Sequence, residues 1–272
     1  MARFEITGGK PLEGTVTISG SKNGSLPLLA AALLVDGEVI LRNIPDISDI
    51  RTMIRMLQAL GVKIEPREDG ALSIDSSHIT SVAAPYDLVR RMRGSFYVAG
   101  PLLARFGEAQ VPLPGGCVIG TRPVDFHVRG FKALGATVEE KYGVMHAKAD
   151  RLVGTRIDMD PRLRSVGATV NLMLAATLAK GTTIIENASR EPEVVDCQQF
   201  LAACGARIDG IGTTTLRITG VERLNGTDWS AIPDRMEAGT FLIAGALTRG
   251  DVTVTPAEPE RHDGAADDPD AW

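Results

Sequence analysis

One sequence pattern occurs four times along the chain, and this internal repetition limits the folds that the chain can form. In each copy an apolar, helix-like run is followed by a glycine and then by a short strand-like run of alternating or β-branched residues. The copies lie at residues 29–45, 101–114, 174–188 and 243–257. The glycines, which we expect to cap helix C-termini, are Gly37, Gly107, Gly181 and Gly250, at spacings of 70, 74 and 69 residues. Repetition at a nearly constant period indicates a repeated supersecondary unit.

A second landmark follows the first three glycines and completes the repeat. It is another helix end running into a strand, at 58–65, 132–140 and 202–210, with Gly61, Gly135 and Gly205 as the expected caps. Each unit is therefore predicted to be helix, strand, helix, strand, with a further strand in some copies. Three complete copies fill roughly 20 to 220 and predict an α/β (α+β) domain built by pseudo-threefold repetition. A fourth copy begins near Pro233, with a helix through about Thr248 and a strand at Val252–Val254.

The middle copy contains an insertion that is centred on a cysteine. The two landmark glycines are 24 residues apart in the first and third copies but 28 apart in the second, and the extra residues surround Cys117. A glycine-rich loop can turn its amides towards an anion, and Arg122 nearby would favour the reactive thiolate of Cys117. The alternative is a surface turn whose small thiol packs inwards. Loops that depart from a scaffold are where functional residues concentrate, which favours a reactive role.

Composition indicates a globular protein that binds neither nucleic acid nor membranes. Of the 272 residues, 44% are hydrophobic and 23% charged, and the net charge of −5 gives no general attraction to polyanions. The three cysteines are odd in number and widely spaced, as in a reducing compartment, and Cys197 and Cys204 fit core positions. The four histidines lack metal-ligand spacing, so no metal is expected. The longest apolar run, ten residues from Leu26 to Val35, is too short to span a bilayer, and the N-terminus is too polar for a signal peptide. We therefore expect a cytoplasmic protein.

Four long motifs resemble the UDP-N-acetylglucosamine 1-carboxyvinyltransferases, a branch of the enolpyruvyl transferase family. They are SGSKNGSLPLLAAALL (19–34), LPGGCVIGTRPVD (113–125), SVGATVNLMLAATLAKGTTIIENASREPEVVD (165–196) and PDRMEAGTFLIAGAL (233–247). The resemblance covers about residues 1 to 258. It implies an inside-out α/β barrel domain made of three repeats, facing a second domain of the same kind.

Because members of that family are longer, the resemblance implies a chain truncated in its second domain. The implied division is an N-terminal strand that belongs to the second domain (1–20), a complete three-repeat domain (21–229), the start of the second domain (230–258) and a disordered tail (259–272). The family's catalytic aspartate would lie beyond the last residue. We therefore expect little turnover from this chain alone and a possible complementing C-terminal polypeptide.

The implied reaction transfers the enolpyruvyl group of phosphoenolpyruvate to the 3-hydroxyl of UDP-N-acetylglucosamine and releases phosphate. In the family this is the first committed step of peptidoglycan synthesis, and it uses no cofactor. The substrates need cations around phosphate and carboxylate groups, and proton transfer needs an acid and a base. Cys117 matches the proton donor, which also forms an adduct with phosphoenolpyruvate and is alkylated by fosfomycin.

The binding residues are carried over from the motifs one by one. The resemblance places phosphoenolpyruvate at Lys22, Asn23 and Arg122. It places UDP-N-acetylglucosamine at Arg93, Arg122, Pro123, Val124, Asp125, Phe126, Ser165, Val166 and Gly167.

Several of these residues also have ordinary structural interpretations. Ser21 or Asn23 could simply cap a helix, and Pro123 with Asp125 could start one. Asp234 and Glu237 also fit a capped helix start.

Two further points concern the charges around the substrates. Arg90 and Arg91, in a helix with Arg93, fit a solvated face. A lysine of some relatives is missing near Ser48, and either Arg162 or Arg164 could replace another lysine.

Two other functions remain open at this point. One is a UDP-sugar-binding fragment or decayed gene product without catalysis. The other is enolpyruvyl transfer to shikimate 3-phosphate, against which the cysteine loop and the Arg122–Asp125 segment argue.

Overall fold

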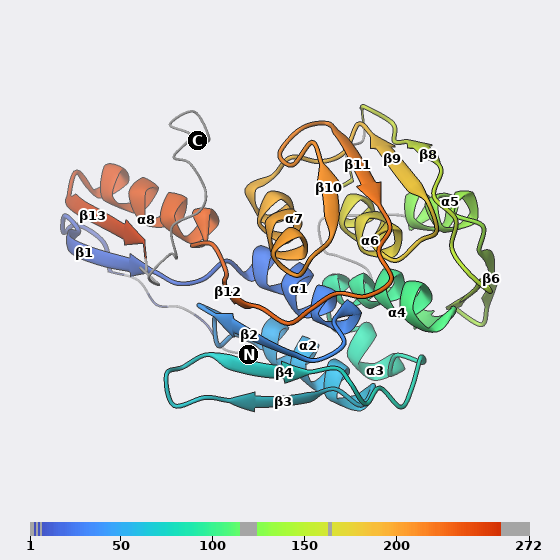
Figure 1. The fold of residues 1–272 in the computed structure, drawn as a ribbon. Helices are drawn as coiled ribbons and strands as arrows, with labels where there is room; N and C mark the ends of the chain where they lie inside the picture. Colours follow the sequence, from blue (N-terminus) through green and yellow to red (C-terminus); the bar gives the residue numbers. More distant parts are fainter. Residues whose placement is uncertain (1–2, 4, 6, 115–123, 163–164, 257–272) are drawn as a thin grey trace.

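A computed structural model describes residues 3, 5, 7–114, 124–162 and 165–256 (Figure 1). The insertion around Cys117 and the predicted tail lie outside these residues. None of the helices in the described ranges combines the length and the apolar composition that a membrane span requires.

Three copies of one unit make up most of the fold. The first consists of α1 (Lys22–Ala31), β2 (Glu38–Arg42), α2 (Ser48–Ala59), β3 (Lys63–Pro66) and β4 (Leu72–Asp75). The second consists of α4 (Ala99–Phe106), β5 (Glu108–Pro112), α5 (Asp125–Ala133), β6 (Thr137–Lys141) and β7 (Val144–Lys148). The third consists of α6 (Val166–Ala176), β9 (Thr182–Glu186), α7 (Pro192–Ala203), β10 (Arg207–Asp209) and β11 (Thr215–Thr219). The repeat was therefore predicted correctly, but the final strand occurs in every copy rather than in some.

Each unit forms its own sheet in the same order, and the sheets are joined in a ring. The orders are β3-β4-β2-β12, β6-β7-β5 and β10-β11-β9-β8. In each sheet the segment that leads in from the previous unit lies parallel to the first strand. Strand β8 (Arg156–Asp158) pairs with β9, and Ala83 forms a parallel bridge to Gln110 of β5. Strand β12 (Asp228–Ser230), which follows the third unit, returns to pair with β2 of the first.

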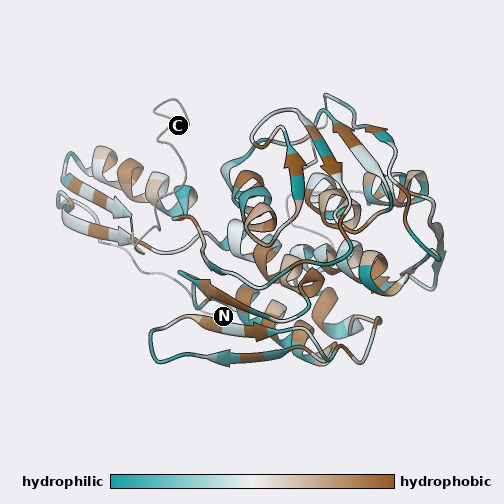
Figure 2. Cartoon of the chain, viewed as in Figure 1, coloured by the Kyte–Doolittle hydropathy of each residue, from teal (hydrophilic) through white to brown (hydrophobic). Residues whose placement is uncertain are grey.

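The first helix of each unit lies inside the domain. All of α1 from Gly24 to Ala31 is buried, and so is α6 from Ala168 to Ala176. Such helices are apolar on every side because protein surrounds them. Helix α1 packs against α7, and α4 packs against α6. Hydrophobic residues accordingly gather where the helices meet the sheets (Figure 2). Cys197 and Cys204 are both fully buried on or next to α7, which confirms their predicted core positions.

The landmark glycines stand near helix ends, though not all of them are caps. Gly107 caps α4 with a φ of 70°. Gly61, Gly135 and Gly205 follow the caps of α2, α5 and α7 with φ of 104°, 95° and 101°, as predicted.

Three of the four first-landmark glycines do not cap a helix. Gly37 and Gly181 take positive φ in the turns that lead to β2 and β9, several residues after their helices. The prediction for Gly250 was wrong, because Arg249 takes the left-handed C-cap conformation instead. Gly250 is needed for a close approach, since a Cβ there would lie 1.9 Å from the carbonyl oxygen of Leu12.

A small unit projects from the main body (Figure 1). It contains α8 (Arg235–Thr248) and β13 (Asp251–Pro256), with β1 (Glu13–Ile18) parallel to β13. Two backbone hydrogen bonds join the two chain segments that connect it to the main body, from Ser21 N to Ile232 O (2.7 Å) and from Asp234 N to Ser19 O (2.9 Å). Several apolar side chains of α8 are exposed, namely Met236, Leu242, Ile243 and Leu247.

Candidate active site

The N-terminus of α1 presents Lys22 and Asn23. Ser21 caps the helix, and its Oγ accepts a hydrogen bond from Gly24 N (3.1 Å). The capping interpretation is therefore correct for Ser21, and it leaves the Asn23 side chain exposed. Lys22 Nζ lies 3.4 Å from Asp49 Oδ2 in a half-exposed ion pair, so a bound anion would share this cation with Asp49.

The N-terminus of α6 is built in the same way. Ser165 is the cap, with its Oγ accepting from Ala168 N (3.2 Å). The amides of Val166 and Gly167 come before the first intrahelical hydrogen bond. Neither α1 nor α6 has an acidic residue in its first turn. The positive end of α6 is therefore not neutralised by a residue of its first turn, which favours an anion. At α1 the amide of Lys22 already donates to Asp234 Oδ2 (3.0 Å), so an anion there would share the helix end with that carboxylate.

Two further predicted segments frame these helix ends. Val124 is the N-cap of α5, Asp125 lies exposed in its first turn and Phe126 is half-buried. Arg93 opens the 3₁₀ helix η2 (Arg93–Val98) and is half-buried.

The three arginines near position 90 do not share one helix. Helix α3 (Tyr86–Val89) ends before Arg90, and η2 begins at Arg93. Arg90 and Arg91 are exposed, and the guanidinium of Arg90 lies over the Tyr86 ring at 5.5 Å. Their solvated position fits the structural interpretation made from the sequence.

Close contacts bring the four predicted segments to one place. A Cβ on Gly94 would lie 2.8 Å from Leu26 Cδ1, so the start of η2 packs directly against α1. A Cβ on Gly167 would lie 3.4 Å from His127 Nε2 and 3.9 Å from Tyr97 Cε1, so α6 begins against both α5 and η2. Residues from α1, η2, α5 and α6 therefore surround one region.

Two titratable side chains beneath this region, the buried His127 and the partly buried Tyr97, stay uncharged near neutral pH. Burial, with a smaller contribution from Arg93, lowers the pKa of His127 to about 3. Burial, with the nearby Cys197, raises the pKa of Tyr97 to about 12. Neutral His127 and Tyr97 near the cationic Arg93 suit a site that receives anionic ligands. The buried carboxylates of Glu193 and Asp196 accept hydrogen bonds from Arg235 and Trp229.

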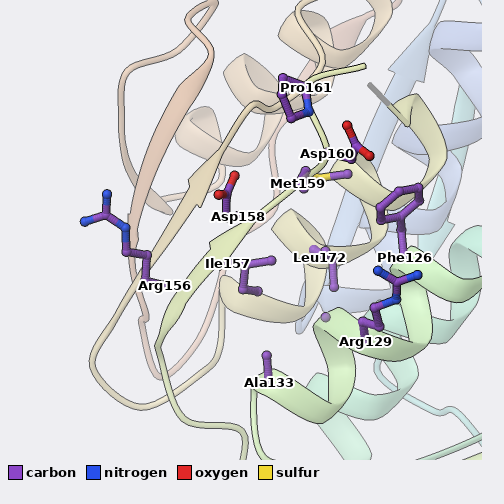
Figure 3. Close-up of a pocket in the computed structure, with 11 residues that line it drawn as sticks. Phe126, Arg129, Ala133, Arg156, Ile157, Asp158, Met159, Asp160, Pro161 and Leu172 are labelled. Carbon is purple, nitrogen blue, oxygen red and sulfur yellow. The ribbon is translucent and has the colours of Figure 1, made fainter. Parts of the chain in front are cut away.

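A cavity of about 370 Å³ opens beside Phe126 (Figure 3). The guanidinium of Arg129 lies over the Phe126 ring at 5.3 Å. Met159, Asp160 and Pro161 form the part of the wall that leads towards the start of α6. Among the predicted site residues that the structure describes, only Phe126 lines this cavity.

Some predicted site residues cannot be placed. Cys117, Arg122 and Pro123 lie outside the described residues, and so does Arg164. Arg162 binds Asp160 through its Nε and Nη2 at 3.0 and 2.9 Å and holds the pKa of that carboxyl down at about 2.

Two buried residues, His127 and Asn171, were not predicted for the site. A usable signal existed for Asn171, because it is an amide within the apolar run VGATVNLMLAA.

Comparison with known proteins gives a consistent result. The family model described as EPSP synthase (3-phosphoshikimate 1-carboxyvinyltransferase) matches residues 6–268. The UDP-N-acetylglucosamine 1-carboxyvinyltransferase of Shewanella amazonensis is 52% identical over 260 residues, which are 95% of this chain and 62% of that protein. The protein of the same name from Cellvibrio japonicus is 53% identical over 256 residues, or 94% of this chain and 60% of that protein.

Solved structures agree on the fold. The enolpyruvyl transferase NikO from Streptomyces tendae superposes with a TM-score of 0.80 at 27% identity, covering 91% of this chain and 58% of NikO. EPSP synthase from Acinetobacter baumannii gives a TM-score of 0.70 at 19% identity over 87% of this chain and 53% of that one, a likeness of fold alone. The chain thus spans about three fifths of the length of the relatives it matches. The predicted fold class is confirmed. The chain belongs to the EPSP synthase family, and within that family the relatives named above, at 52% and 53% identity, are UDP-N-acetylglucosamine 1-carboxyvinyltransferases.

Proposed function

We propose that this chain binds UDP-N-acetylglucosamine and phosphoenolpyruvate for enolpyruvyl transfer to the 3-hydroxyl of the sugar. The observation that carries the proposal is that α1 and α6 both pack against η2, which carries Arg93, and that α6 begins against α5. Two anionic substrates need at least two anion-binding places. The names of the relatives supply the chemical identity of the substrates.

We assign phosphoenolpyruvate to the α1 end of the site. Lys22 supplies a charge and Asn23 an exposed amide, and Arg122 would hold the phosphate with its planar fork of donors. Binding there requires Lys22 to turn from Asp49 or to share its charge between Asp49 and the ligand. In this assignment Cys117 protonates the vinyl carbon of phosphoenolpyruvate as general acid.

We assign UDP-N-acetylglucosamine to the α6 and α5 ends. The amides of Val166 and Gly167, with the Ser165 cap, suit the diphosphate. Arg93 adds a cation, and the segment from Pro123 to Phe126 would hold the nucleoside. Phe126 contributes an aromatic ring to the wall of the cavity.

Other partners follow from the same proposal. We place the protein in the cytoplasm, with neither nucleic acid nor membrane as a partner. We propose that turnover also requires a polypeptide segment equivalent to the part of the relatives that this chain does not match. Residues 21–229 would form the domain that this segment faces.

Binding can be tested with two arginines two positions apart. Arg93→Gln should weaken binding of UDP-N-acetylglucosamine, measured by calorimetry, by about ten- to hundredfold, because one charge-assisted hydrogen bond contributes about 1.5–3 kcal/mol. Arg91→Gln is the matched control and should bind like the wild type, because Arg91 is exposed outside η2. Failure of the wild type to bind, or equal losses in both variants, would contradict the proposal.

Turnover needs a separate measurement. Phosphate release from phosphoenolpyruvate should require UDP-N-acetylglucosamine as acceptor. It should be highest when the segment of a relative that this chain does not match is supplied as a second polypeptide. Cys117→Ala should reduce the rate by about 10²–10⁴-fold, the usual contribution of a general acid. Faster release with shikimate 3-phosphate as acceptor would assign the chain to the other function instead.

A further inference from the structure

Asn171 links three separate segments from inside α6. Its side chain is fully buried, and its Oδ1 accepts a hydrogen bond from Gly100 N of α4 at 2.7 Å. Its Nδ2 donates to Phe96 O of η2 at 2.8 Å and lies 3.0 Å from Nδ1 of His127 on α5. One amide group therefore ties α6 to the elements that carry Arg93 and Val124–Phe126.

These partners fix both the amide orientation and the histidine tautomer. Phe96 O can only accept and Gly100 N can only donate, so the amide of Asn171 has one possible orientation. Its second N–H then points at His127 Nδ1, which must accept. The proton of the neutral imidazole is consequently on Nε2.

The protonated edge of His127 faces the start of α6. Nε2 lies 3.4 Å from where a Cβ of Gly167 would be, so the ring rests against the first turn of that helix. The Phe96 ring meets the imidazole edge-on, with centroids 5.0 Å apart. The His127 side chain is thus clamped between η2 and the turn that carries the Val166 and Gly167 amides.

We propose that Asn171 and His127 form a positioning pair that sets the first turn of α6 for the diphosphate of the nucleotide sugar. The identity of that ligand rests on the proposed function. The pair touches no reacting atom in this assignment. It acts through Gly167 by holding the anion-binding amides in register with α5 and Arg93. Gly100 has no room for a side chain, because a Cβ there would lie 2.8 Å from Asn171 Oδ1, whereas a Cβ on Gly167 would make an ordinary contact with His127.

The proposal can be tested in the full chain with two readouts. Nitrogen-15 spectra of the wild-type imidazoles should show His127 protonated at Nε2 only. Asn171→Asp should move the proton to Nδ1, because a carboxylate can accept there but cannot donate. Asn171→Leu and Asn171→Asp should each bind UDP-N-acetylglucosamine about tenfold more weakly in calorimetry, as expected for loss of a buried hydrogen-bonded support.

A control in the same helix separates positioning from simple destabilisation. Thr177→Val removes the buried bond from Thr177 Oγ1 to Met173 O at the far end of α6 and should leave affinity unchanged. An Nδ1 proton in the wild type, or wild-type affinity in folded Asn171→Leu, would overturn the positioning pair alone. Absence of binding by the wild type would overturn the proposed function as well, with the tautomer still measurable.

Discussion

At the scale of single residues, the site is distinguished by which side chains stay neutral. The buried His127 and the partly buried Tyr97 both lie against Gly167 and near Arg93, and desolvation suppresses the charged form of each. A charge on His127 would be desolvated and would also be repelled by Arg93. These two neutral side chains therefore support anion-binding groups without competing with them for protons near neutral pH.

The burial of neutral His127 makes the free energy of unfolding decrease at acidic pH. The pKa of His127 is about 3 in the folded chain against an ordinary value of 6.5, so the unfolded chain takes up this proton first as the pH falls. The contribution of His127 to the free energy of unfolding is complete above pH 6.5 and declines as the pH falls towards 3.

Urea unfolding at a series of pH values can isolate this contribution. The difference in unfolding free energy between wild type and His127→Gln should become smaller as the pH falls from 6.5 towards 3. The unfolding free energy of Thr177→Val should instead be lower than that of the wild type by about 0.5–1.5 kcal/mol at every pH, since the substitution removes one hydrogen bond between uncharged groups. A constant difference between wild type and His127→Gln would contradict the buried neutral imidazole.

At the scale of elements, the inner helices depend on close approach. A Cβ on Gly100 of α4 would lie 2.3 Å from the carbonyl oxygen of Asn171 on α6, which leaves no room for even a methyl group. Gly239 of α8, in contrast, has no atom within 4 Å of its would-be Cβ. A side chain is therefore sterically excluded at Gly100, whereas the space around Gly239 would accept one.

Substitution by alanine should change stability in opposite directions at these positions. Gly100→Ala should lower the free energy of unfolding by about 1–3 kcal/mol, because it overpacks a helix contact. Gly239→Ala should raise it by about 0.4–1 kcal/mol, because alanine restricts the unfolded chain and fits the helix. Denaturant unfolding of both variants checks the pair, and a stable Gly100→Ala chain would mean that α4 and α6 are not in close contact.

At the scale of the whole molecule, β12 closes the ring of repeats. It leaves the third unit and pairs with β2 of the first, while Trp229 within it contacts the third. The indole Nε1 donates to Asp196 at 3.0 Å, and the ring meets Phe200 at 6.2 Å. The first and third units are therefore coupled through three residues of strand.

Loss of this contact should weaken two distant units together. Trp229→Ala should reduce the free energy of unfolding by about 2–3 kcal/mol, somewhat less than for a fully buried aromatic residue. Hydrogen exchange should show reduced protection in β2 and α7 at once. Tyr142→Ala, at a fully exposed aromatic residue, should change stability by no more than about 0.5 kcal/mol. Reduced protection in only one unit would contradict a closed ring.

Most of the scaffold was predictable because repetition carries local information. The roles of the helix-ending glycines Gly61, Gly135 and Gly205 were predictable because the positive φ that follows a helix end favours glycine whatever the rest of the fold. The prediction for Gly250 was wrong because a glycine can either cap a helix or allow close approach of a distant segment, here Leu12. The sequence does not distinguish these two uses. The site segments at α1, η2, α5 and α6 were predicted only through motif resemblance.

The sequence by itself determined the repeated unit, the family and the segments that could bind anions, since these depend on residues near each other in the chain. Only the tertiary structure decided that η2, α5 and α6 share the amide of Asn171, that His127 is buried and neutral, and that Lys22 faces Asp49. Those contacts join residues from 27 to 75 positions apart. No local pattern encodes such distances, because they follow from how the three units close upon one another.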